Sequence, residues 1–438
     1  MSVTSTSTPV SEQTAAYAER FAAFRATPAF GSDRLRTLRD QAFGAFMATG
    51  FPTSRSEEYK FTNVGPIAEA PFGAEGAAEP TRKALEPFLF DGAIRTQIVI
   101  VNGRLSKTLS SMEALPRGVT VDQVSDAIIA APSATPAALA SAPFVALNTA
   151  FFERPVVLMV PHHAVVDEPI QVLFVNTPGS HRMMASTRLL VVAGEQSQLT
   201  LIETYAGLPG SGQGFTNAVT DFVVSEGAVV DHYKLQRETT SAYHMASMFV
   251  HCGRSSNFSS HSFATGGKIV RNDVFATLDG EGAECTLNGL YLAGGDTLID
   301  NHTSIDHAKA HCPSHEIYKG ILSGHAKAVF NGKIVVRQDA QKTDAKQTNK
   351  ALLLSDDASI NTKPQLEIFA DDVKCTHGAA IGQLDDDAMF YLRARGIAEP
   401  DARNMLIHAF AGDILNRIKI DAVKARVEKS VFAVLETL

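Results

Sequence analysis

The chain has 438 residues, of which 45% are hydrophobic, so it is long enough to bury a large core in two or three structural units. Its net charge of −8 comes from 39 basic and 47 acidic residues without a run of either sign, which argues against nucleic acid and an anionic membrane as main partners. No segment has the length of a membrane span, and the N-terminus MSVTSTSTPVSEQ is too polar for a signal peptide. Four cysteines without a C-x-x-C pair favour a reducing compartment, so a cytoplasmic location is expected.

Residues 1–92 are expected to form an N-terminal helical domain with a connector. Apolar residues recur three and four positions apart in EQTAAYAERFAAFRA and SDRLRTLRDQAFGAFMATG, which is typical of amphipathic helices. Ser32 stands where a helix N-cap is expected, and Gly50 with Pro52 predicts the end of the second helix. The loop FPTSRSEEYKFTNVGP and an Ala-, Gly- and Pro-rich connector follow.

Residues 93–385 are expected to form an all-β core. Short β-branched runs begin at QIVIV and continue through CTLNGLYL, and glycine- and proline-containing turns separate them. Many of these runs are apolar on both faces, as in LLVV, so a solenoid and a large sandwich both fit the pattern. The sequence has no strict hexapeptide or nonapeptide repeat that would decide between the two.

Residues 386–438 are expected to form a C-terminal helical domain. Aspartates at 385–387 favour a helix start and Gly396 a helix end. The next segment, EPDARNMLIHAFAGDILNRI, places its apolar residues on one stripe. That stripe is compatible with packing on the core and with docking a partner. Its members are Ala402, Met405, Leu406, Ala409, Phe410 and Ile414.

The β core lacks the familiar motifs of nucleotide hydrolysis and of serine or zinc hydrolases. The glycine-rich loop AGLPGSGQGF has neither the lysine nor the helix that a phosphate-binding loop requires. The sequence also contains no G-x-S-x-G and no H-E-x-x-H.

Histidines are concentrated between residues 302 and 325. Imidazole and thiolate are ligands for zinc and iron, so this segment has the donors for a metal site. However, the spacings match no standard finger and Pro313 interrupts the segment, so hydrogen-bonded residues at turns of the core are the other interpretation. The residues concerned are His302, His307, His311, His315 and His325, with Cys312 among them.

The segment KCTHGAAIG contains Cys375 and His377 two residues apart. On an extended strand these side chains project from one face about 7 Å apart, because side chains alternate and the rise is about 3.3 Å per residue. They are able to share an iron or sulfur ligand there, and Gly378 leaves room for a partner's backbone. The pair alone is also compatible with a buried thiol beside a polar residue.

Two segments resemble the SufB/SufD family of iron–sulfur cluster assembly scaffolds. One begins at His307, contains IYKGILSG and KCTHGAAIG, and is followed by YLRARGI; the other is SRSEEYKFTNV. The resemblance is continuous over about residues 260–415 and weaker upstream. The segment KCTHGAAIGQLDDD is similar to the SufD pattern, whereas SufB has a His-Glu-Ala arrangement at this place.

The resemblance implies a mainly β fold with a right-handed parallel β-helix flanked by N- and C-terminal helical domains. It implies pairing with SufB through the β-helix, and a homodimer is possible when SufB is absent. It further implies that the ATPase SufC docks on the C-terminal helices, which would explain why this chain lacks a phosphate-binding loop. The candidate SufC contacts are Met405, Leu406, Phe410 and Ile414.

The resemblance also implies a site for a nascent iron–sulfur cluster at the interface with SufB. The histidine of the family motif maps onto His377, as a transient ligand of iron or of the cluster shared with a SufB cysteine, and Cys375 is the candidate second donor. A purely interfacial hydrogen bond is the alternative role for His377. No cofactor is expected to be tightly bound in the isolated chain, and a flavin is possible but is not assigned to any residue.

The sequence is therefore compatible with three functions. The leading hypothesis is a non-enzymatic scaffold subunit. The second is a metal-dependent hydrolase or lyase on a β-solenoid that uses the histidines of residues 302–325. The third is a SufB-like scaffold that accepts sulfur itself on Cys375.

Overall fold

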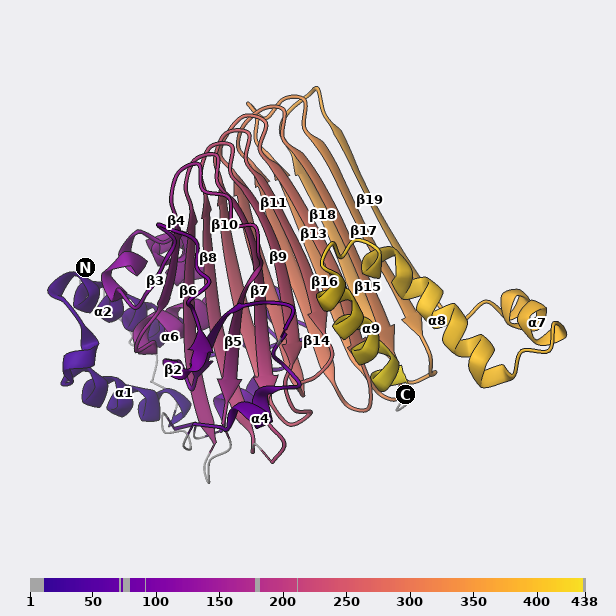
Figure 1. Cartoon of the computed structure of the whole chain (residues 1–438), viewed down its shortest axis with the longest axis horizontal. Helices are drawn as coiled ribbons and strands as arrows, with labels where there is room; N and C mark the ends of the chain where they lie inside the picture. The colour runs from indigo at the N-terminus through magenta and orange to yellow at the C-terminus, as the bar shows by residue number, and fades with distance from the viewer. Residues whose placement is uncertain are drawn as a thin grey trace, which may run out of the picture.

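The computed structural model describes residues 12–70, 72–73, 79–90, 92–177, 182–210 and 212–435. Figure 1 shows a long β-helix with one group of helices at the N-terminal end and another at the C-terminal end. The predicted polar N-terminus up to Ser11 and residues 74–78 of the connector lie outside the described residues. No helix in the described part of the chain is long and apolar enough to cross a membrane.

The helices match the predicted segments at both ends of the chain, and two more occur between residues 136 and 151. Ser32 caps α2 as predicted, because its Oγ accepts a hydrogen bond from the Leu35 N–H at 3.3 Å. The helices are α1 (Glu12–Arg25), α2 (Asp33–Thr49), α3 (Gly65–Ala68), α4 (Arg82–Leu85), α5 (Pro136–Ser141), α6 (Pro143–Phe151), α7 (Asp386–Ala394), α8 (Glu399–Leu415) and α9 (Asp421–Leu435).

The strands form two sheets that face each other across the β-helix. The first sheet contains β2 (Arg104–Ser111), β1 (Thr96–Val101), β5 (Ile170–Asn176), β7 (Gln198–Gly207), β9 (Val229–Arg237), β11 (Asn257–Ala264), β13 (Glu284–Ala293), β15 (Pro313–Leu322), β17 (Asp344–Leu353) and β19 (Lys374–Gly382), in that order. The second contains β3 (Thr120–Asp122), β4 (Val156–Val160), β6 (Met183–Ala193), β8 (Gly214–Val224), β10 (Tyr243–Cys252), β12 (Ile269–Leu278), β14 (Leu298–His307), β16 (Lys327–Val336) and β18 (Ser359–Ile368).

Successive strands alternate between the two sheets, so each coil places one strand in each. From β4 onward, all neighbouring strands within a sheet are parallel, and Ile269 for example pairs with Leu298, which pairs with Lys327. This arrangement confirms the predicted parallel β-helix and rules out the sandwich. Between the sheets lies a core that includes Leu158, Phe222, Phe258 and Phe330.

Helices cover the outer faces of both sheets, but at different ends of the β-helix. The N-terminal helices α2 and α6 bury Phe46 and Phe144 against β8 and β10 of the second sheet. The C-terminal helices α8 and α9 bury Ile414 and Val427 against the first sheet, where Leu290 and Leu352 lie. The short helices α5 and α6 join the N-terminal group, although they occur within the segment predicted as all-β.

The last coil of the β-helix is open. Strands β18 and β19 lie at the ends of their sheets, and no further described strand pairs with them. Gln347 on β17 is buried, whereas His377, its register partner on β19, is exposed. The same change from buried to exposed occurs at other inward positions of these two strands. Helix α7 projects away from the β-helix at the right of Figure 1 and contains no buried residue.

Candidate functional site

Cys375 and His377 lie on the last strand at the open end. Cys375 packs against a small cluster that includes Ala345 and Ile334, so its side chain points into the β-helix. His377 is two residues further on and has the same orientation because side chains alternate along a strand. It pairs in register with the buried Gln347 of β17, but it is exposed because no coil covers it. The open end therefore carries a thiol and an imidazole on one inward face.

The environment of Cys375 favours the protonated thiol. Partial burial raises the pKa of this thiol above its ordinary value, and the neighbouring Asp344 carboxylate adds to the increase. A thiol with a raised pKa is a poor nucleophile at neutral pH and must lose its proton to bind a metal. Cys375 is therefore less suited than a low-pKa cysteine to accept sulfur by itself.

The histidines of residues 302–325 do not converge. His307 Nε2 lies 3.0 Å from Ser314 Oγ, and the exposed His325 Nδ1 lies 3.5 Å from Asp357. His302 belongs to a separate cluster with Glu58 and Asp300. Among the described residues, no group of three or more His, Cys, Asp or Glu side chains is placed to hold a metal ion. The described residues of this segment therefore do not form a metal site within this chain, because successive turns and strands direct these side chains to different places.

The loop that contains SRSEEYKFTNV binds across the second sheet. Arg271 on β12 donates to the Glu58 carbonyl oxygen at 2.6 Å, and its guanidinium stacks 4.0 Å from the ring centre of Tyr59. The Asp300 carboxylate on β14 accepts from Arg271 at 2.7 Å and also from the Thr62 hydroxyl. Glu57 and Lys363 form a further hydrogen bond, so the loop reaches the edge strand β18.

His302 is charged at neutral pH in this loop contact. Burial alone would lower the pKa of His302, but the Asp300 and Glu58 carboxylates beside it raise the pKa to about 9. This role of His302 is not evident from the sequence. Glu57 and Glu58 stand out as an acidic pair in the N-terminal loop, but nothing in the sequence indicates which residue of the β core they contact.

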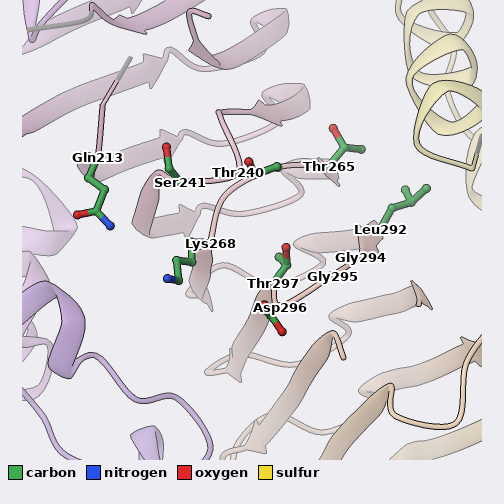
Figure 2. Close-up of a pocket in the computed structure, with 11 residues that line it drawn as sticks. Gln213, Thr240, Ser241, Thr265, Lys268, Leu292, Gly294, Gly295, Asp296 and Thr297 are labelled. Atoms are coloured by element: carbon green, nitrogen blue, oxygen red, sulfur yellow. The ribbon is translucent and has the colours of Figure 1, made fainter. Parts of the chain in front are cut away.

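A pocket of about 540 Å³ lies at the turns of the β-helix, away from Cys375 and His377. Figure 2 shows that its polar side chains come from successive turns, which precede β8, β10, β12 and β14. Most of them carry a hydroxyl group; the others are one glutamine, one lysine and one aspartate, and the lining contains no cysteine or histidine. The lining residues are Gln213, Thr240, Ser241, Thr265, Gly266, Lys268, Leu292, Gly294, Gly295, Asp296 and Thr297.

The predicted docking stripe on α8 has members with different exposure. Met405 is 51% exposed, whereas Ile414 is completely buried beneath the helix. Leu406 is half-buried, and so is Phe410, whose ring lies 4.8 Å from Lys319 Nζ. Three of the four candidate contacts therefore have surface available to a partner in this chain.

Two aromatic residues on α7 are exposed and were not among the predicted contacts. Phe390 is 74% exposed and Tyr391 is 56% exposed, so α7 presents apolar surface to solvent. Their adjacent positions in DDDAMFYLRARG were the available signal.

Comparison with known proteins assigns nearly the whole chain. Residues 174–410 match the model described as "SUF system FeS cluster assembly, SufBD core domain", and residues 11–172 match the SufBD protein N-terminal region. The chain belongs to the SufBD family. The resemblance that the sequence motifs indicated is therefore confirmed, and SufBD proteins act in iron–sulfur cluster assembly.

Curated SufBD relatives match along most of their length. An iron–sulfur cluster assembly SufBD family protein of Synechocystis is 33% identical over 394 residues, which cover 87% of this chain and 86% of the relative. The iron–sulfur cluster assembly protein SufD of Escherichia coli is 30% identical over 385 residues, with 87% and 88% covered. SufD of Bacillus subtilis is 24% identical over 281 residues, with 64% of each chain covered. Two of these relatives are named SufD, which agrees with the SufD pattern around His377.

Proposed function

We propose that this chain is the SufD-type scaffold subunit of an iron–sulfur cluster assembly complex, pairing with SufB and docking the ATPase SufC. The observation that carries the proposal is the open end of the β-helix, where unpaired edge strands and the Cys375–His377 pair occur together. A nascent cluster is the cargo of this site, assembled between His377 and a cysteine of SufB. The chain has no enzymatic activity of its own in this proposal.

The two edge strands support pairing with a second β-helix. Each leaves a row of backbone N–H and C=O groups without a strand neighbour among the described residues, which makes it a template for another chain. Large apolar side chains are exposed beside these edges: Phe369 is 64% exposed, Ile381 49% and Ile368 40%. A partner β-helix would cover them, and a homodimer without SufB would use the same edges.

The donor set supports a shared site. A thiolate and an imidazole both bind iron, but among the described residues no third His, Cys, Asp or Glu side chain joins these two in a group placed to hold a metal ion. Iron in a cluster needs further ligands, which a partner must supply. The raised pKa of the Cys375 thiol argues against the alternative in which this chain, like SufB, accepts sulfur on its own.

The exposed face of α7 and α8 supports the docking of SufC. Phe390, Tyr391 and Met405 present apolar surface outside the contact with the β-helix, and Lys319 anchors α8 by donating to the Phe410 carbonyl oxygen at 2.8 Å. The four cysteines are free in the structure, which is compatible with the predicted cytoplasmic location. The location itself and the binding of a flavin stay predictions.

The proposal is tested by co-expression of this chain with SufB and SufC. The expected result is a complex of all three chains that assembles an oxygen-sensitive iron–sulfur chromophore when iron and sulfide are supplied anaerobically. A chain that stays alone with both partners present would overturn the proposal. Persulfide on Cys375 of the isolated chain after incubation with a cysteine desulfurase would instead favour the SufB-like alternative.

A further inference from the structure

A column of three side chains leads from the interior of the β-helix to His377. Glu316 on β15 pairs in register with Gln347 on β17, and Gln347 pairs in register with His377 on β19. Glu316 and Gln347 are buried and therefore point inward, with 1% and 2% of their surfaces exposed. Neighbouring strands of a sheet are about 4.8 Å apart, so the three side chains stack on successive rungs.

The amide of Gln347 is held by its neighbours. Its Nε2 donates to Glu316 Oε2 at 2.8 Å, one rung deeper in the β-helix. Gly332 on the facing strand leaves the space for this amide, since a Cβ at that position would lie 2.1 Å from Gln347 Nε2. This hydrogen bond orients the amide so that its nitrogen points toward the interior of the β-helix.

The other end of this amide has no partner. Gln347 Oε1 is buried and accepts no hydrogen bond from any described residue. A buried acceptor without a hydrogen bond destabilises the fold, so a nearby donor is expected. His377 is the next residue of the column toward the open end, and its ring offers an N–H.

An acceptor for the imidazole N–H is what a metal-binding histidine requires. Such a histidine usually donates one ring N–H to an oxygen, which fixes the tautomer and leaves the lone pair of the other nitrogen for the metal. We propose that Gln347 is a positioning residue for His377: its Oε1 accepts one ring N–H and thereby directs the other ring nitrogen to iron at the open end. This inference rests on the proposed function of His377 as a ligand.

The test is the tautomer of His377 in the full-length chain, measured without metal. Histidine labelled with ¹⁵N in the ring gives nitrogen chemical shifts that distinguish the two neutral tautomers, and the signal of His377 is the one lost in His377→Gln. We expect a single predominant tautomer in the wild type at alkaline pH. In Gln347→Leu the acceptor is gone, and the signals should shift to the mixture of tautomers of a free imidazole.

Two further variants separate positioning from a loss of structure. Asn349→Leu removes another buried inward amide from the same strand, so it should leave the His377 signals unchanged. The exchange Glu316→Gln with Gln347→Glu keeps one acid, one amide and an acceptor oxygen beside His377, so it should restore the predominant tautomer. Gln347→Met replaces Gln347→Leu if the leucine variant does not fold.

Equal His377 tautomer populations in the wild type and in folded Gln347→Leu or Gln347→Met would overturn the inference. An equal change in Asn349→Leu would do the same, because it would show a general effect of losing a buried amide. The readout is independent of cluster assembly. If the tautomer behaves as expected but His377→Ala leaves cluster yield unchanged, the role of His377 as a ligand is overturned, whereas the hydrogen bond between its ring and Gln347 stands.

Discussion

The imidazole of His302 lies between two carboxylates: its Nδ1 is 3.2 Å from Glu58 Oε2 and its Nε2 is 3.0 Å from Asp300 Oδ1. Glu58 and His302 are 244 positions apart in the chain. The contact joins the N-terminal loop to the second sheet of the β-helix. Its strength depends on the charge of His302, so it makes the stability of this region depend on pH.

We predict that His302→Gln removes a pH-dependent part of the stability. The folded chain holds the His302 proton up to a pKa of about 9, compared with 6.5 for an ordinary histidine. The stabilisation is therefore fully present below about pH 6.5 and is lost as pH rises through about 9. Urea unfolding should show the variant to be less stable by roughly 1–3 kcal/mol at about pH 6 and by much less at about pH 10.

His325→Gln is the matched control, because the His325 side chain is 70% exposed. It should change the unfolding free energy little at any pH. A constant difference between His302→Gln and the wild type across the whole range would contradict a charged His302.

For Glu316 we predict that the uncharged variant is more stable than the wild type, in contrast to His302→Gln. Burial raises the pKa of Glu316 to about 7, so the folded chain keeps a proton that the unfolded chain releases near pH ~4.3. The fold loses stability as pH rises between these two values. Glu316→Gln keeps an oxygen that accepts from Gln347 but does not titrate. It should therefore be more stable than the wild type by roughly 1–3 kcal/mol at about pH 8 and similar at about pH 4.

The measurement is urea unfolding followed by circular dichroism at several pH values. Glu113→Gln, at an exposed position, should show no such pH-dependent gain. A Glu316→Gln variant that is destabilised at about pH 8 would mean that the carboxylate is ionised and needed in the folded chain.

His377→Ala should leave the fold and the pairing with SufB intact and lower the yield of assembled cluster. The side chain is exposed at the open end, so its removal leaves no cavity in the core. The yield is measured by the visible absorbance of the complex and by growth of cells that depend on this pathway. Wild-type cluster yield in the variant would show that His377 is not part of the site.

Met405→Glu on α8 should weaken the binding of SufC without unfolding the chain. Met405 is 51% exposed, so a carboxylate there stays in water in the free chain and is desolvated only in a complex. Co-purification with SufC measures the effect, and co-purification with SufB should be unchanged. SufC binding at the wild-type level would remove Met405 from the docking surface.

Ile414 on the same helix should behave differently. Its side chain is buried against the first sheet, so Ile414→Ala creates a cavity and should cost about 2–5 kcal/mol of unfolding free energy. Thermal unfolding checks this expectation. A variant as stable as the wild type would mean that α8 is loosely attached to the β-helix.

Ile381→Lys should weaken pairing at the open end. Ile381 is 49% exposed on the edge strand β19, and a lysine at a strand edge opposes pairing with another chain. Sedimentation should show less complex with SufB and less homodimer. Met159→Lys, which also replaces an exposed apolar residue on a strand but far from this end, is the control and should change neither.

Local signals explain the parts of the fold that the sequence predicted. Ser32 and Gly50 mark the limits of α2, and the apolar spacing in EPDARNMLIHAFAGDILNRI marks α8, because capping and amphipathicity act within a few residues. The helices α5 and α6 were missed. They are short and apolar apart from the prolines with which they begin, Pro136 and Pro143, so their composition resembles that of a buried strand.

The coil repeat escaped detection for a different reason. Partners on neighbouring coils are 29 residues apart for Asn272 and Asn301 but 31 apart for Glu316 and Gln347. A repeat of variable length, whose inward positions hold amides and carboxylates as well as apolar side chains, leaves no fixed period in one sequence.

The sequence by itself determined the helical ends, the β core, the family and the identity of Cys375 and His377 as the donors to consider, because these follow from local pattern and motif. Only the tertiary structure decided that the histidines of residues 302–325 separate, that Ile414 is buried while Phe390 is exposed, and that Gln347 lies next to His377. The histidine positions and the Gln347–His377 pairing depend on register between strands about 30 residues apart, and the exposure of Ile414 and Phe390 depends on how α7 and α8 pack on the β-helix. One sequence contains no local signal for either.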